Sequence, residues 1–361
     1  MRAALGLARR GLGRVWPNPA VGCILVKDDK VVGRGWTQPG GRPHAETEAL
    51  GRAGGLAGGA TAYVTLEPCA HHGKTPPCAK ALAEAKVARV VAAIEDPDPR
   101  VSGRGFDLLR AAGIAVEVGL LAGDSEEINA GFFRRAIAGR PLVTLKLATS
   151  QDGRIATHKG ESRWITGPVA RAEVHRLRAE HDAVMIGIGT AMADDPELSV
   201  RLPGFEQRQP VRIVVDGRLR LSLTSKLVRQ AGTHPLWLIT RKGAEASRRK
   251  VFESCGVEII EIAPDAEGNV DHGLAMAALG ERGLTRVLVE GGAHLAAALL
   301  RHGLIDRVAW FRAPMLIGGD GVPALVAFGV DRLSEAIGLE RLAAGPIESD
   351  MMEIFTVTKG R

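Results

Sequence analysis

The sequence predicts an α/β protein built from two domains that meet near residue 140. Its 361 residues exceed the size at which a single hydrophobic core keeps growing, so two cores are expected. Strand-like apolar runs alternate with helical patterns along the chain, which is typical of layered α/β domains. A helical pattern ends at Gly139, and Arg140-Pro141 then leads into a new strand. We therefore expect domains at 1–140 and 141–361, and no internal repeat relates them.

The first domain is expected to open with a β-hairpin. Two apolar runs, 21–26 and 31–35, flank a polar turn. Helical and strand patterns then alternate, with helices at 44–53, 78–85, 105–112 and 126–138 and strands at 62–66, 89–94 and 114–118. The first ten residues, basic and without a long apolar stretch, are expected to run straight into the first strand rather than form a secretory signal.

The second domain repeats this alternation with different elements. Strands are expected at 142–148, 183–187, 211–215, 236–239 and 286–290, with a helix at 168–180. The strand that ends at Glu290 runs into Gly291-Gly292 and then a helix, where small residues would let a phosphate approach free backbone N–H groups. An ordinary strand-to-helix turn has the same pattern. No G-x-G-x-x-G follows the domain's first strand, which argues against a Rossmann site.

Charge and composition narrow the class of partner. The net charge of +6 suits anionic ligands in general. Only 4% of residues are aromatic and one is tyrosine, so few platforms exist for stacking nucleic-acid bases. No apolar run is long enough for a membrane span. We therefore expect a cytoplasmic protein that binds a small phosphorylated molecule, and neither nucleic acid nor a membrane.

One histidine and two cysteines form a candidate zinc site. His44-Ala45-Glu46 opens a helix, and Cys69 and Cys78, each preceded by proline, follow a later strand. One imidazole and two thiolates are a known zinc set, and three protein ligands leave a fourth position for a catalytic water. Glu46 is placed to move that water's proton. The order resembles the His-x-Glu and Pro-Cys-x-x-Cys pattern of nucleobase deaminases.

The spacing of the cysteines departs from that pattern. Eight residues, 70–77, separate them instead of two, and this interval carries histidines and a lysine that could recognise a base or a phosphate. The alternative is an ordinary helix start beside buried thiols. Cys23 and Cys255, in apolar surroundings, are expected to be core residues.

Several long motifs of the first domain resemble the family of bifunctional riboflavin biosynthesis proteins. The matching segments are 18–22, 44–46, 65–78, 96–99 and 103–105. The resemblance implies a cytidine-deaminase-like α/β/α layer fold and Zn²⁺ on His44, Cys69 and Cys78. It implies Glu46 as the proton carrier of a hydrolytic deamination that releases ammonia. Further residues that the resemblance places against the substrate are Asn18, His71 and Lys74.

The resemblance continues through the second domain, in segments 145–154, 161–166, 187–196 and 289–292. It implies a dihydrofolate-reductase-like fold that uses NADPH to reduce the ribosyl side chain of a phosphorylated pyrimidine to ribityl. The residues that would line NADPH are Ala148, Trp164, Thr190, Asp194, Gly292, Ala293, His294, Leu295, Ala296, Ala297 and Ala298. Those that would hold the substrate are Ser162, Arg178, Leu198, Arg201 and Glu290. A homo-oligomer formed through this domain is left open.

Other readings of these residues stay open at this point. An arginine fork suits a phosphate, yet Arg178 and Arg201 also suit a solvated surface. Asp194 and Asp195 before Pro196 suit a turn. A nucleic-acid deaminase with a basic RNA-binding half would bind RNA with strong salt dependence and have no use for NADPH. A non-enzymatic, zinc-stabilised binding protein would not need Glu46.

Overall fold

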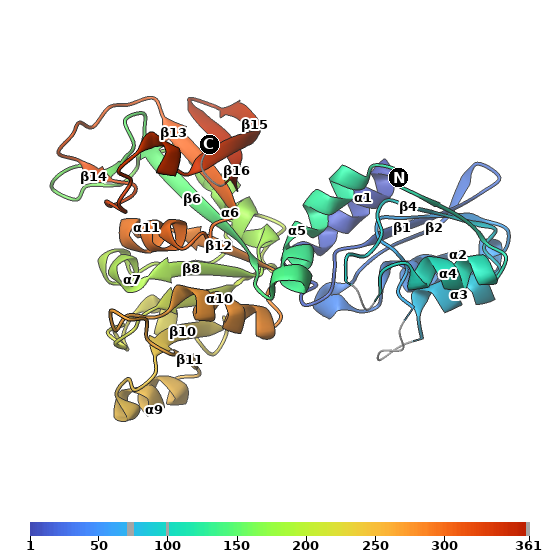
Figure 1. Cartoon of the computed structure of the whole chain (residues 1–361), viewed down its shortest axis with the longest axis horizontal. Helices are drawn as coiled ribbons and strands as arrows, with labels where there is room; N and C mark the ends of the chain where they lie inside the picture. The colour runs from blue at the N-terminus through green and yellow to red at the C-terminus, as the bar shows by residue number, and fades with distance from the viewer. Residues whose placement is uncertain (71–75, 99–100, 359–361) are drawn as a thin grey trace. The chain divides into compact units, whose positions relative to one another are not determined.

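The computed structural model describes residues 1–70, 76–98 and 101–358, and it divides into two compact units, Met1–Gly139 and Arg140–Arg361 (Figure 1). Each unit is built around its own β-sheet. Among the described residues, the helices lack the combination of length and apolar character that a membrane crossing requires.

The sheet of the first unit has five strands in the order β2-β1-β3-β4-β5. The strands are β1 (Gly22–Lys27), β2 (Lys30–Trp36), β3 (Thr61–Val64), β4 (Arg89–Ala92) and β5 (Ala115–Val118). β1 is antiparallel to both β2 and β3, whereas β3, β4 and β5 run parallel. The predicted hairpin and the three later strands are therefore confirmed.

Helices cover both faces of this sheet (Figure 1). They are α1 (Arg2–Ala8), α2 (Ala45–Ala53), α3 (Cys78–Glu84), α4 (Arg104–Ala111) and α5 (Ala122–Ala138). Ala49, Leu82 and Phe106 of α2, α3 and α4 share one core with the sheet, while Leu5 of α1 and Ile128 of α5 share another. This is the expected α/β/α layering.

The expectation that the first residues run straight into a strand is wrong, because they form α1. This helix has seven residues, no side-chain cap and no acidic residue in its first turn. Helices this short are marginal by themselves. Burial of Ala4, Leu5 and Ala8 against the rest of the unit stabilises α1, and a local sequence pattern does not report such packing.

The second unit contains a nine-stranded sheet in the order β11-β10-β9-β8-β12-β6-β13-β16-β15. Its strands are β6 (Leu142–Ser150), β8 (Ala183–Gly187), β9 (Val211–Val215), β10 (Leu236–Arg241), β11 (Glu258–Ile262), β12 (Arg286–Glu290), β13 (Arg307–Ala313), β15 (Gly338–Ile347) and β16 (Asp350–Thr358). β16 is antiparallel to β13 and β15, and the other neighbours are parallel. A separate pair joins β7 (Arg154–Ala156) to β14 (Val322–Pro323).

Helices connect the parallel strands of this sheet. They are α6 (Pro168–Glu180), α7 (Ile188–Asp194), α8 (Lys226–Arg229), α9 (Ala246–Ser254), α10 (His272–Glu281) and α11 (Ala293–Arg301). The carboxyl ends of β6, β8, β9, β10 and β12 share one edge of the sheet because these strands are parallel. In open α/β sheets, ligands bind outside that edge.

One cysteine prediction is right and the other is wrong. Cys23 is 0% exposed, whereas Cys255 is exposed. Cys255 follows α9, and its backbone N–H donates to the carbonyls of Val251 and Phe252. Phe252 and Val257 are buried beside it and fill the apolar side of this turn, so the thiol is left toward solvent.

Candidate active sites

The first site begins where α2 meets the sheet. His44 precedes α2, with extended backbone angles, and Glu46 lies in the first turn. The helix approaches β2 closely because Gly35 has no side chain: a Cβ there would lie 2.1 Å from the carbonyl oxygen of Ala45. Glycine at this position therefore lets the first turn of α2, with its imidazole and carboxylate, lie directly on the sheet.

The two cysteines complete the cluster. Cys69 follows β3 by a short loop and Cys78 is the first residue of α3. His44 Nδ1 lies 3.7 Å from Cys69 Sγ and 3.4 Å from Cys78 Sγ, and the three ligand atoms lie within 4.8 Å of one another. A tetrahedral zinc ion separates its nitrogen and sulfur ligands by about 3.5 Å. The observed spacing therefore fits a zinc ion.

The electrostatics of this cluster favour a thiolate at Cys69 and raise the pKa of the Glu46 carboxyl. Hydrogen bonding from Cys78 lowers the pKa of Cys69 to about 4, while the same bond and burial raise the pKa of Cys78. Glu46 is 4% exposed. Burial, followed by the Cys69 charge, raises its pKa to about 7, the range in which a carboxyl can both accept and return a proton.

A second buried carboxylate anchors the loop that carries Cys69. Glu67 is 4% exposed and accepts backbone N–H bonds from Asp96 at 3.2 Å, Gly103 at 3.1 Å and Gly105 at 2.8 Å. It thus ties segment 65–70 to segments 95–98 and 103–105, which contain two of the motifs noted in the sequence. Sequence reasoning did not assign a role to Glu67.

The predicted substrate contacts of the first site are placed only in part. The side-chain amide of Asn18 donates to the carbonyl oxygen of Gly41 at 2.7 Å and thereby links the segment before β1 to the loop before α2. His71 and Lys74 lie outside the described residues. Their roles stay predictions.

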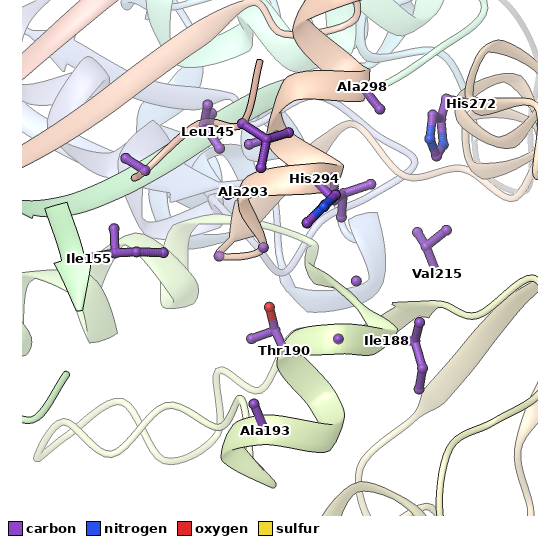
Figure 2. Close-up of a pocket in the computed structure, with 18 of the residues that line it drawn as sticks. Leu145, Ile155, Ile188, Thr190, Ala193, Val215, His272, Ala293, His294 and Ala298 are labelled. Atoms are coloured by element: carbon purple, nitrogen blue, oxygen red, sulfur yellow. The ribbon is translucent and has the colours of Figure 1, made fainter. Parts of the chain in front are cut away.

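The second site is a cavity of about 1000 Å³ at the carboxyl edge of the large sheet. Figure 2 shows Thr190 of α7 and Ala293 of α11 on facing sides of it, with Leu145 and Ile155 toward one end and Val215 and His272 toward the other. Of the residues predicted to line NADPH, most border this cavity: Ala148, Thr190, Asp194, Gly292, Ala293, His294, Leu295, Ala296 and Ala298. Such a volume is at the upper end of the range for small-molecule sites.

The turn between β12 and α11 forms a cradle in this cavity. Gly291 and Gly292 have φ values of 78° and 87°, which only glycine adopts without strain. A Cβ at Gly292 would lie 3.1 Å from Thr190 Oγ1. The absence of side chains therefore leaves room for a phosphate near the start of α11, and the cavity fits a dinucleotide.

Two residues predicted to contact NADPH do not border the cavity. Ala297 is buried in the packing of α11. Trp164 is 67% exposed, and the guanidinium carbons of Arg163 and Arg171 lie 5.9 Å and 4.5 Å from its ring centroid. The tryptophan therefore stands at the surface, held by cations.

Of the predicted substrate residues of this unit, one lines the cavity and four do not. Ser162 borders the cavity, whereas Arg178, Leu198, Arg201 and Glu290 are not among its lining residues. Arg178 forms a two-pronged ion pair with Glu290 of β12, through Nε to Oε1 at 2.5 Å and Nη2 to Oε2 at 2.9 Å. Leu198 is 3% exposed and packs in the core. Arg201 is exposed and pairs with Glu197, as a surface residue would.

Lys146 is a cavity residue that sequence reasoning did not assign. It borders the cavity from β6, opposite Glu290 in the register of β6 and β12. Burial lowers its pKa, and the Glu290 charge opposes that shift. Lys146 could have been predicted as a site residue because it is the single lysine in the apolar run 142–148, and a charge in a buried strand requires a partner.

The two aspartates before Pro196 have different roles. Asp194 is the last residue of α7 and borders the cavity. Asp195 has φ 38°, and its Oδ1 accepts the backbone N–H of Lys226 at 2.9 Å. The turn-forming alternative therefore applies to Asp195.

Comparisons with known proteins match both units. Residues 1–94 match the family described as the cytidine and deoxycytidylate deaminase zinc-binding region, and residues 141–337 match the RibD C-terminal domain. The chain is 43% identical over 347 residues to riboflavin biosynthesis protein RibD of Escherichia coli, covering 93% of this chain and 92% of that protein. The RibD of Aquifex aeolicus is 38% identical, with 98% and 97% covered.

Solved structures agree with these matches over the whole chain. Acinetobacter baumannii RibD superposes with a TM-score of 0.89 at 39% identity, covering 99% of this chain and 98% of that chain. A Thermotoga maritima protein described as a diaminohydroxyphosphoribosylaminopyrimidine deaminase/5-amino-6-(5-phosphoribosylamino)uracil reductase gives 0.86 at 32% identity, with 99% and 97% covered. With a zinc-type cluster in one unit and a dinucleotide-sized cavity in the other, the chain belongs to the RibD family of bifunctional riboflavin biosynthesis enzymes, whose cofactors are zinc for deamination and NADPH for reduction.

Proposed function

We propose that residues 1–140 deaminate 2,5-diamino-6-(5-phosphoribosylamino)pyrimidin-4-one by hydrolysis and that residues 141–361 then reduce the ribosyl side chain of the product to ribityl. The general activity, deamination and reduction in riboflavin biosynthesis, follows from the family. The specific substrates are supported by the description of the similar Thermotoga protein. The observation that carries the proposal is the buried Glu46 beside the cluster of His44, Cys69 and Cys78.

At the first site, His44, Cys69 and Cys78 would hold zinc, which when bound supplies a Lewis acid at an open coordination position. Glu46 would take a proton from the attacking water and deliver it to the leaving amino group. Its burial keeps the carboxyl close enough to neutral for both transfers. Asn18, His71 and Lys74 are proposed to contact the substrate.

At the second site, the predicted residues that border the cavity, from Ala148 to the start of α11, would bind NADPH, which supplies the hydride. The same proposal includes Trp164 and Ala297, on the resemblance alone. Gly291 and Gly292 would let a phosphate reach the backbone N–H groups at the start of α11.

The substrate would lie at the Leu145 end of the cavity, beside Lys146 and Ser162. Glu290 lies opposite Lys146 in the register of β12 and β6 and pairs with Arg178. Neither residue of this ion pair lines the cavity, and we propose that the substrate's hydroxyl and phosphate groups reach it from there. Arg201 and Leu198 are proposed as further contacts. An arginine already fixed by a two-pronged ion pair is preorganised for an anionic or hydroxyl-rich ligand.

The experiment is an anaerobic assay of the zinc-loaded chain with the diaminopyrimidinone ribosyl phosphate, in which ammonia release and NADPH oxidation are followed separately. A zinc chelator should stop both signals, and adding the deaminated intermediate should restore NADPH oxidation alone. Ammonia release without NADPH oxidation would contradict the proposed reductase substrate. Folded, metal-loaded protein that gives neither signal would contradict both substrates and return the nucleic-acid deaminase to consideration.

The remaining expectations concern partners and location. The substrate class, a small phosphorylated pyrimidine, follows from the family. The homo-oligomer through the reductase unit and the cytoplasmic location stay predictions, and size-exclusion chromatography coupled to light scattering tests the first.

A further inference from the structure

An asparagine of α5 is buried and has no part in the function proposed above. Asn129 is 2% exposed and lies inside a helix that runs from Ala122 to Ala138. Asparagine is unfavourable inside a helix, because its side chain competes for backbone hydrogen bonds. A buried amide also costs free energy unless it is hydrogen-bonded. The partners of this side chain therefore indicate why an asparagine stands here.

The partners are the two backbone groups of Ala20, far away in the sequence. Asn129 Oδ1 accepts the N–H of Ala20 at 2.9 Å, and Asn129 Nδ2 donates to the Ala20 carbonyl oxygen at 3.2 Å. Two residues of neighbouring antiparallel strands exchange hydrogen bonds in the same way, yet Ala20 lies outside the strands. Ala20 is 4% exposed, so its backbone groups need partners inside the protein. Within the parts of the chain that the structure describes, Asn129 alone supplies them.

The same face of α5 makes a second contact with the first site. Ser125 lies one turn before Asn129 and is 0% exposed. Its Oγ donates to the carbonyl oxygen of Thr65, and Thr65 Oγ1 accepts the N–H of Gly22 at 3.0 Å. This face of α5 therefore packs against the start of β1 and the end of β3 through satisfied hydrogen bonds.

By binding Ala20, Asn129 fixes the segment that carries Asn18. Asn18 Nδ2 donates to the carbonyl oxygen of Gly41 at 2.7 Å, so the amide nitrogen is occupied. Its Oδ1 has no hydrogen-bond partner among the described residues, and the side chain is half-buried. An acceptor that is held in place and left open suits an amino or N–H group of a pyrimidine.

Asn18 has little room to move against the loop before α2. A Cβ at Gly41 would lie 2.4 Å from Asn18 Nδ2, so the amide lies directly on the Gly41 backbone. Gly41 is three residues before His44. Contacts thus run without a break from Asn129 through Ala20 and Asn18 to the loop that leads into the zinc cluster.

We propose that Asn129 is a positioning residue for deamination, because it holds Asn18 where the open Oδ1 accepts a hydrogen bond from the substrate. The inference rests on the proposed function of the first site, in which Asn18 contacts the substrate. Among the described residues, the hydrogen bonds of Asn129 reach Ala20 and Ser125 and do not reach Glu46 or the zinc ligands. Asn129 therefore acts through Asn18, and a displacement of about 1 Å there can lower the rate by about 10²-fold.

The test is a double-mutant cycle between Asn18 and Asn129 in the full, zinc-loaded chain, measured as kcat/KM for ammonia release. Asn18→Ala and Asn129→Ala should each lower kcat/KM by about tenfold or more. Once Asn18 is replaced, Asn129→Ala should lower kcat/KM by less than about a further twofold, because the two residues act as one unit. Zinc content, and NADPH oxidation with supplied deaminated intermediate, should match the wild-type chain.

Two further variants separate positioning from a loss of stability. Asn129→Leu removes the same hydrogen bonds without leaving a cavity, so it should fold more readily than Asn129→Ala and show the same dependence on Asn18. The matched control is Phe133→Leu, which shortens a buried side chain of the same helix that packs in the core of the unit. It should lower the free energy of unfolding yet keep kcat/KM within about twofold of the wild-type value.

The outcomes distinguish this inference from the proposed function. Losses of the single variants that multiply in the double variant would overturn the inference, because they would show that Asn129 acts independently of Asn18. Unchanged kcat/KM in folded Asn129→Leu would overturn it as well. A zinc-loaded wild-type chain that releases no ammonia contradicts instead the proposed function, and with it the inference.

Discussion

Two buried carboxylates of the first unit serve different tasks because their hydrogen-bond partners differ. Glu67 accepts three backbone N–H groups, so it joins two segments of the chain. Glu46 lies beside the Cys69 thiolate, and burial together with that charge raises its pKa to about 7. One carboxylate therefore holds structure, while the other can exchange a proton.

Replacing Glu46 with Gln removes the proposed proton carrier and keeps the side-chain shape. Ammonia release should fall about 10²–10⁴-fold, while zinc content, measured by atomic absorption, should stay at one ion per chain. The control is Glu48→Gln on the same helix, where Glu48 pairs with Arg52 at the surface; it should release ammonia at the wild-type rate. Retained activity in Glu46→Gln would instead support a structural zinc site.

Replacing Glu67 with Ala leaves three backbone N–H groups without their acceptor. The free energy of unfolding of the first unit should fall by about 3 kcal/mol or more, because each buried unsatisfied donor costs about 1–3 kcal/mol. Urea denaturation of the zinc-loaded chain measures this. Glu95→Ala, which removes an exposed hydrogen bond to Ser102 in the same loop, should change the free energy of unfolding by less than about 0.5 kcal/mol, and an equally small effect of Glu67→Ala would contradict the anchoring role.

A buried histidine makes the stability of the second unit depend on pH. His181 Nδ1 lies 2.7 Å from the Leu177 carbonyl oxygen and Nε2 lies 3.0 Å from Thr144 Oγ1. Burial lowers its pKa from 6.5 to about 4. Between these pH values the unfolded chain thus binds one more proton than the folded chain. The contribution of His181 to the free energy of unfolding is therefore complete above pH 6.5 and falls by about 3 kcal/mol as the pH approaches 4.

The variant His181→Gln should therefore lose less stability than the wild-type chain between pH 7 and pH 4.5. Urea denaturation at several pH values measures the difference in slope, which should correspond to about one proton. The neighbouring Asp182, whose pKa burial raises, is present in both proteins and does not affect the comparison. Parallel slopes in the two proteins would show that His181 is already protonated in the folded state.

The residues of the zinc cluster could be predicted from sequence, and several other site residues could not. A histidine two positions before Glu46 and a proline before each cysteine are local patterns that indicate a zinc site. Lys146, Glu67 and Asn129 have no such pattern, since each acquires its role from partners far along the chain. Glu67, for example, needs the N–H groups of segment 96–105.

At the scale of elements, many helices and strands were predicted from their patterns, but the sequence analysis missed β11, the central strand β13 and the hairpin of β15 and β16. The helix at 168–180 coincides with α6, which begins at a proline. The hairpin of β15 and β16 was not predicted, because most of β15 is exposed and shows no apolar run. Such an edge strand forms by pairing with its neighbour β16, which its own residues do not indicate.

Because α2 packs closely on β2, two glycine-to-alanine substitutions in this region should change the stability of the first unit in opposite directions. Gly35→Ala places a Cβ 2.1 Å from the Ala45 carbonyl oxygen, so it should destabilise the first unit by about 1–3 kcal/mol and weaken zinc binding at His44. Gly51→Ala lies in the same helix with open space around its Cβ, and should stabilise by about 0.5–1 kcal/mol. Thermal unfolding measures both, and a neutral Gly35→Ala would contradict the close contact.

At the scale of the whole molecule, two units with separate cores carry separate chemistry. The predicted boundary near residue 140 and the α/β class of both halves could be read from sequence because each half has its own alternation of elements. The order of the nine strands could not, since β6 pairs with β12 and β13, which lie more than a hundred residues further along the chain.

If each unit carries its own reaction, a substitution that abolishes the activity of one unit should leave the activity of the other unchanged. Cys78→Ser should reduce zinc content and abolish ammonia release, because an alkoxide is a poor replacement for a thiolate ligand. NADPH oxidation with supplied deaminated intermediate should remain within about twofold of the wild-type rate. Cys23→Ser, at a buried cysteine outside the cluster, is the control and should keep its zinc. A reductase that fails together with the zinc site would show that the units are coupled.

The strand order also determines when each strand can pair during synthesis of the chain on the ribosome. The first unit is complete once Gly139 has been made, and β6 follows immediately. Its neighbours β12 and β13 begin only at Arg286 and Arg307. Both edges of β6 therefore stay unpaired while β8 to β11 are synthesised and pair with one another. β6 includes Val143 and Leu145, which are buried in the folded protein. We therefore expect nascent chains to pass through a stage in which the first unit can already fold while the sheet of the second unit still lacks its central strands, and unpaired strand edges make such a stage prone to aggregation.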